Sequence, residues 1–155
     1  MRRVLGSLLL LTGIGLGASP VRADESYIEP IGGLNWNREE SAVVTGIAVG
    51  HDFDIDESHF WGIEVTAEKE LEEDRRVAWG VGGRFGRTML SGGKLFVGGA
   101  WQTKECADCG HAVALTAGWE QEIAEEIYAK VEFKHLLVED ERDKDGLVFG
   151  IGFMF

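Results

Sequence analysis

Two cysteines separated by two residues are the first candidates for chemistry in this chain. Cys106-Ala-Asp-Cys109 has the spacing of a redox-active pair, and His111 follows closely. A reactive pair would need a helix N-terminus to lower a thiol pKa, and no helical pattern is evident there. Metal binding by Cys106, Cys109 and His111 would have only three nearby ligands. In a secreted chain, a disulfide between Cys106 and Cys109 is the favoured interpretation.

A serine next to a histidine could act as a nucleophile and its base. Ser58 and His59 are adjacent, but neighbouring residues of a strand point to opposite faces. An acyl hydrolase needs serine, histidine and an acidic side chain within hydrogen-bonding reach, and no His-x-Ser pair occurs. We therefore expect no catalysis.

Three other short motifs could bind ions or phosphate. The acidic stretches 52–57 and 143–146 lack the full spacing of a calcium loop, so they are interpreted as solvated turns. The glycine-rich stretch 80–86 lies within a predicted strand with no helix after it, which favours close packing over phosphate binding. The sequence therefore predicts no metal and no cofactor.

The first 23 residues have the pattern of a secretory signal peptide. Arg2 and Arg3 precede an apolar run from Val4 to Gly17, and small or apolar residues stand at Val21 and Ala23. The apolar run is too short to span a membrane. We expect cleavage after Ala23, leaving one domain over residues 24–155. Without Arg2, Arg3 and Arg22 its net charge is 12 − 27 = −15, which argues against a nucleic-acid partner.

Eight alternating segments separated by turn residues follow the signal peptide. The expected strands cover 27–37, 41–54, 59–71, 75–89, 93–105, 110–123, 126–138 and 146–155. Each is about as long as a tilted membrane strand requires. A chain that spans a membrane with strands must close them into a barrel, because lipid offers no hydrogen bonds to an open edge. The pattern predicts an all-β, eight-stranded, antiparallel up-and-down transmembrane barrel.

Sorting each strand by parity separates an apolar face from a charged face that also carries most glycines. A narrow barrel needs small side chains inside, whereas glycines exposed in mid-strand would only weaken the sheet. The charged face is therefore expected inside and the apolar face in lipid. All five tryptophans fall on the apolar face and suit the two membrane interfaces: Trp36, Trp61, Trp79, Trp101 and Trp119.

The last nine residues, 147–155, alternate strictly and end in phenylalanine. This segment resembles the closing strand of bacterial outer-membrane barrels, and the chain resembles small barrels of the OmpA/OmpX/opacity type. The resemblance implies that Gly150, Phe153 and Phe155 form a signal for the outer-membrane assembly machinery. It also implies a location in the outer membrane of a Gram-negative cell, with its lipid as partner and a monomer as the expected state.

The inward charges are expected to pair across the lumen, because unpaired buried charges cost several kcal/mol each. The residues predicted to hold the lumen closed are Glu64, Glu68, Arg84, Lys104, Glu120, Lys130 and Glu132. The predicted function is a structural or surface role with a plugged lumen. Passage of ions or small solutes is the alternative. Adhesion is a further alternative, although the predicted outer loops are short.

Overall fold

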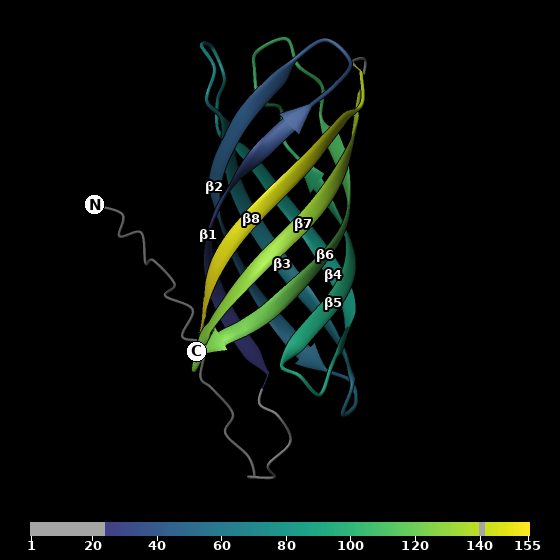
Figure 1. Cartoon of the computed structure of the whole chain (residues 1–155). Coiled ribbons are helices and arrows are strands. Elements are labelled where there is room, and N and C mark those ends of the chain that lie inside the picture. Colours follow the sequence, from purple (N-terminus) through teal and green to yellow (C-terminus); the bar gives the residue numbers. More distant parts are fainter. Residues whose placement is uncertain (1–23, 140–141) are drawn as a thin grey trace, which may run out of the picture.

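The computed structural model describes residues 24–139 and 142–155, and the predicted signal peptide lies outside them. The eight strands are β1 (Glu25–Trp36), β2 (Ser41–Asp54), β3 (His59–Glu70), β4 (Ala78–Thr88), β5 (Gly93–Gln102), β6 (Ala112–Ala124), β7 (Ile127–Val138) and β8 (Lys144–Met154). Each strand pairs antiparallel with the next, and β8 pairs with β1 to close the barrel (Figure 1). This confirms the predicted fold class.

The two ends of the barrel differ in their connections. The loop end carries 37–40, 71–77, 103–111 and the connection from β7 to β8, whereas the turn end carries 55–58, 89–92 and 125–126. Phe155 lies at the turn end, where its backbone hydrogen-bonds Ser26 at the start of β1. Membrane barrels usually have short turns in the periplasm and longer loops outside the cell. The loop end is therefore the side expected to face outward.

Side chains alternate across the wall as the sequence predicted. Branched and aromatic apolar side chains form an exposed outer band that includes Val49, Val65, Val97 and Phe149. Charged side chains point inward and are buried, among them Glu29, Arg84, Glu120 and Lys134. This distribution is the reverse of a water-soluble barrel. The described residues contain no helix long and apolar enough to cross a membrane.

Glycines on the inner face leave room for large side chains on the strands around them. A Cβ on Gly150 would lie 2.3 Å from a carboxylate oxygen of Glu29, and one on Gly62 would lie 2.3 Å from Asp52 Oδ1. Both distances are far below van der Waals contact, so any larger residue would displace a buried carboxylate. The interior is thus filled by pairing small residues with long ones.

Candidate functional site: the charged lumen and its cap

Arg84 is the centre of the lower lumen, nearer the turn end. Its Nε and Nη2 donate to the two carboxylate oxygens of Asp52 at 2.9 and 2.8 Å, and its Nη1 donates to Glu120. Lys94 lies 3.1 Å from the same Asp52 carboxylate and also pairs with Glu25. Asp52 and Glu120 are both buried, so Arg84 and Lys94 together balance two carboxylates that have almost no contact with water.

Aromatic rings enclose the Arg84 guanidinium. Its Cζ lies 4.5 Å from the ring centre of Tyr27, 5.1 Å from that of Phe96 and 5.6 Å from that of Phe60. Such contacts favour a cation most strongly where water is excluded. The rings therefore pack around the Arg84 guanidinium and hold it in one orientation.

Lys130 and Lys134 organise the middle of the lumen. Lys130 Nζ lies 2.7 Å from Glu29, 3.5 Å from Glu132 and 3.9 Å from Glu64. Lys134 Nζ lies 3.7 Å from Glu132 and also pairs with Glu68. Glu132 thus joins the two lysines into one chain of charges. We call the ion-paired residues of the lower and middle lumen the lumen network: Glu25, Glu29, Asp52, Glu64, Glu68, Arg84, Lys94, Glu120, Lys130, Glu132 and Lys134.

A small cavity remains between the two parts of the lumen network. It measures about 30 Å³, and its wall includes Glu64, Thr66, Arg84, Gln102 and Lys134. One water molecule needs roughly 10 to 15 Å³ of cavity volume, so the space suits about two waters. Its polar wall could hydrogen-bond them. A cavity of this size has no room for a sugar, a nucleotide or an acyl chain.

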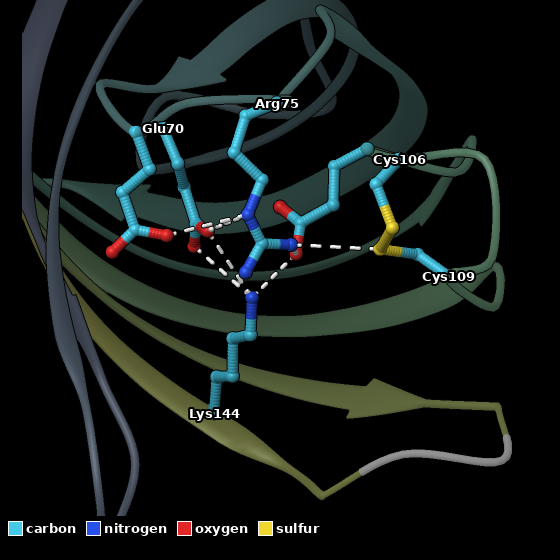
Figure 2. The surroundings of a disulfide bond; sticks show 7 residues. Glu70, Arg75, Cys106, Cys109 and Lys144 are labelled. Carbon is cyan, nitrogen blue, oxygen red and sulfur yellow. Dashed lines mark hydrogen bonds and ion pairs between the residues drawn. A yellow bond between two sulfur atoms is a disulfide. The ribbon is translucent and has the colours of Figure 1, made fainter.

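Four charged side chains form a second cluster at the loop end, which we call the cap cluster: Glu70, Arg75, Glu105 and Lys144. Figure 2 shows Glu70, Arg75 and Lys144 beside the disulfide. Arg75 lies 3.5 Å from Glu70 and 2.8 Å from Glu105. Lys144 Nζ lies 3.2 Å from Glu70 and also pairs with Glu105. The cluster joins the β3–β4 loop, the β5–β6 loop and the start of β8 across the mouth.

The charge state of Arg75 is fixed by these neighbours. Partial burial opposes the charge, but the carboxylates of Glu105, Glu70 and Glu72 outweigh it and raise the Arg75 pKa. Arg75 is therefore a fixed positive charge in the cap cluster.

Cys106 and Cys109 form a disulfide within the β5–β6 loop, beside the cap cluster. Arg75 Nη1 lies 3.5 Å from Cys109 Sγ and is shared between that sulfur and Glu105 (Figure 2). The disulfide leaves neither cysteine available as a thiolate ligand for a metal. Glu105, which directly precedes Cys106, pairs with Arg75 and Lys144.

The structure corrects one of the seven residues predicted for the lumen. Glu64, Glu68, Arg84, Glu120, Lys130 and Glu132 lie in the lumen network, but Lys104 is exposed. The predicted strand 93–105 extends too far, because β5 ends at Gln102 and the chain then turns into the β5–β6 loop. Alternation along the strand predicted that Lys104 points inward. Because the strand ends two residues earlier, Lys104 does not enter the lumen.

Several lumen and cap residues were not predicted as site residues. Asp52 belongs to an acidic stretch that was interpreted as a solvated turn, yet it is buried within β2 and binds Arg84. Its inward parity between Gly50 and Asp54 was the available signal. Lys144 has inward parity but precedes the predicted strand 146–155, although β8 begins at Lys144. Arg75 had outward parity in the predicted strand 75–89, whereas β4 begins only at Ala78. The aromatic residues of the lumen were also missed: Tyr27, Phe60, Phe96 and Tyr128.

All five tryptophans lie on the outer surface in two groups. Trp36, Trp79 and Trp101 lie near the loop end, and Trp61 and Trp119 lie nearer the turn end. Phe53 stacks on Trp61 with ring centres 4.4 Å apart. Rings of this kind at both edges of an apolar band match the aromatic girdles of membrane barrels.

Ser58 and His59 do not hydrogen-bond each other through their side chains in the described structure; His59 and His51 each have a different partner. His59 Nδ1 lies 3.0 Å from Asp56, which also accepts the backbone N–H groups of Ser58 and His59. These backbone N–H groups and the His59 ring lower the Asp56 pKa. Ser26 Oγ instead lies 2.8 Å from His51 Nδ1, joining β1 to β2 at the turn end. The Ser58–His59 pair is therefore part of a turn.

No protein-family model matches this chain, and no curated protein matches its sequence. Solved structures do match. The N-terminal β-barrel domain of Pseudomonas aeruginosa OprF is 14% identical, with a TM-score of 0.57 over 84% of this chain and 97% of that one. The attachment invasion locus protein Ail of Yersinia pestis is 9% identical, with a TM-score of 0.59 over 87% and 100%.

A structure reported as de novo design of transmembrane β-barrels is 12% identical, with a TM-score of 0.59 over 84% of this chain and 95% of that one. At these identities the similarity concerns the fold. The chain has the fold of the eight-stranded outer-membrane β-barrels, as the resemblance of its sequence implied.

Proposed function

We propose that the protein is an integral outer-membrane barrel with a structural or surface role, whose lumen is closed by the lumen network and which performs no catalysis. The observation that carries this proposal is that clusters of ion pairs follow one another along the lumen, centred on Arg84 near the turn end, on Lys130 and Lys134 in the middle, and on Lys144 at the loop end. An apolar band with tryptophans at both edges supports insertion in lipid.

The proposal of closure also rests on packing. Arg84 and the surrounding rings close the lumen above a pocket of about 90 Å³ at the turn end, the cavity above them suits about two waters, and the cap cluster covers the loop end. Eight strands leave an interior that side chains can fill. The fully described connections at the loop end, 37–40, 71–77 and 103–111, have at most nine residues each and offer little surface for a large partner, which favours a structural role over adhesion.

Passage of small cations is a second candidate, and one observation favours it. Seven carboxylates of the lumen network (Glu25, Glu29, Asp52, Glu64, Glu68, Glu120, Glu132) face four cationic side chains (Arg84, Lys94, Lys130, Lys134), so the lumen carries an excess of negative charge. A path opened through it would favour cations over anions.

Two measurements test the proposal. The protein purified in detergent should migrate differently on a denaturing gel before and after boiling, and should show a β spectrum by circular dichroism. In a planar lipid bilayer it should give no steady conductance. Folding as a soluble monomer without detergent would refute the membrane role, and a steady cation-selective conductance would replace closure with passage.

A further inference from the structure

The two sulfurs of the disulfide differ in their surroundings. Cys109 is only 4% exposed, whereas Cys106 is partly accessible to solvent. Both lie in the β5–β6 loop, outside the strands and at the loop end of the barrel. A thiol from the surrounding medium can therefore approach Cys106 more easily than Cys109.

The second difference is a fixed positive charge. Arg75 Nη1 lies 3.5 Å from Cys109 Sγ (Figure 2). Three carboxylates on two loops and on β3 hold the guanidinium in place: Glu70 at 3.5 Å, Glu72 at 3.4 Å and Glu105 at 2.8 Å. A neighbouring cation stabilises a thiolate, and a more stable thiolate is a better leaving group in disulfide exchange.

We infer that Cys106–Cys109 is a site of thiol–disulfide exchange with a fixed direction. An external thiolate attacks Cys106 Sγ, the S–S bond breaks, and its electron pair leaves on Cys109 Sγ beside Arg75. The second thiol of a dithiol then displaces Cys106 from the mixed disulfide. The dithiol is oxidised to its disulfide, and both protein cysteines are reduced, taking up the two thiol protons. This activity goes beyond the proposed membrane role.

The charges around the sulfur make the inference specific. Arg75 favours the departing thiolate, whereas the Glu105 carboxylate shares Arg75 Nη1 and opposes a second negative charge there. Lys144 pairs with Glu105 and Glu70 and has no bond to either sulfur. Removing Arg75 and removing Glu105 should therefore change the rate of reduction in opposite directions.

The first test locates the attack on the unmodified sequence. The folded protein in detergent is exposed briefly to glutathione and quenched with acid. A protease that cleaves before Asp108 then places Cys106 and Cys109 on separate fragments for mass spectrometry. The glutathione adduct is expected on Cys106. Adducts mainly on Cys109, or divided evenly between the two cysteines, would overturn the inference.

The second test measures the rate of reduction by dithiothreitol in folded variants. R75Q should slow reduction by about threefold to tenfold, and E105Q should accelerate it by a similar factor. R142Q is the matched control, because Arg142 pairs with Glu39 in a neighbouring loop and has no bond to a sulfur. If R75Q and E105Q both accelerate reduction, the Arg75 contact only shields the disulfide and the inference fails.

Discussion

Arg84 on β4 forms a two-point contact with Asp52 on β2, with both donor–acceptor distances between 2.8 and 2.9 Å. The two strands are not neighbours, because β3 lies between them. The contact passes over Gly62, whose missing side chain leaves the space that the Asp52 carboxylate occupies. A cation and a carboxylate that look unrelated in the sequence thus meet above a glycine on the strand between them.

Replacing Arg84 with methionine should destabilise the barrel strongly. Asp52 and Glu120 would both remain buried without their shared cation, and breaking a buried pair costs about 3 to 5 kcal/mol. The measurement is the free energy of unfolding in urea, with the protein in lipid vesicles. R87M on the same strand is the control, because Arg87 is exposed and its loss should change stability by less than about 0.5 kcal/mol. Equal effects of the two variants would contradict a role for the buried pair.

Gly62→Ala should also destabilise the barrel, by about 1 to 3 kcal/mol, because the new Cβ would lie 2.3 Å from Asp52 Oδ1. Gly83→Ala is a close control on the next strand. A Cβ at Gly83 points outward, and its nearest contact is the Gly62 carbonyl oxygen at 3.4 Å. Unfolding in urea should therefore separate the two alanine variants, and a large effect of Gly83→Ala would contradict this account of the inner face.

The strands and their two faces were predictable, because a period of two and the placement of glycine are properties of the sequence. Glu64, Lys130 and Glu132 were assigned to the lumen on that basis, and the structure places them there. Their partners were not predictable. Which carboxylate meets which lysine depends on the register of all eight strands and on closure between β1 and β8.

Residues near strand ends were the least predictable part of the site. Lys104 and Lys144 both have inward parity near the loop end, yet Lys104 is exposed and Lys144 is buried in the cap cluster. The difference is where each strand ends: β8 begins at Lys144, whereas β5 ends before Lys104. Parity specifies a face only while the chain stays in the sheet.

Val65→Arg tests which face meets lipid. Val65 lies on the outer face of β3, paired with Val49 and Val81 on the two neighbouring strands. Arginine in the middle of a lipid-facing band costs about 2 to 4 kcal/mol, whereas near the edge it costs about 0 to 1 kcal/mol. Leu71→Arg, just beyond β3, is the matched control. Stability measured in vesicles should fall for V65R and change little for L71R, and an unaffected V65R would argue against a lipid-facing band.

The turn between β6 and β7 offers a stabilising substitution. Its two residues are Glu125 and Glu126, and Glu126 has φ = 63°. A residue with a Cβ pays about 1 kcal/mol or more in this left-handed region, and glycine does not. Glu126→Gly should therefore raise the free energy of unfolding by up to about 1 kcal/mol, because the gain in the turn is partly offset by the greater freedom of glycine in the unfolded chain.

Glu125→Gly supplies the comparison, since Glu125 is not among the described residues with positive φ, and it should lower stability. Urea titration of both variants in vesicles measures the difference. A stabilised E125G or a destabilised E126G would mean that the strain in this turn lies elsewhere than at Glu126.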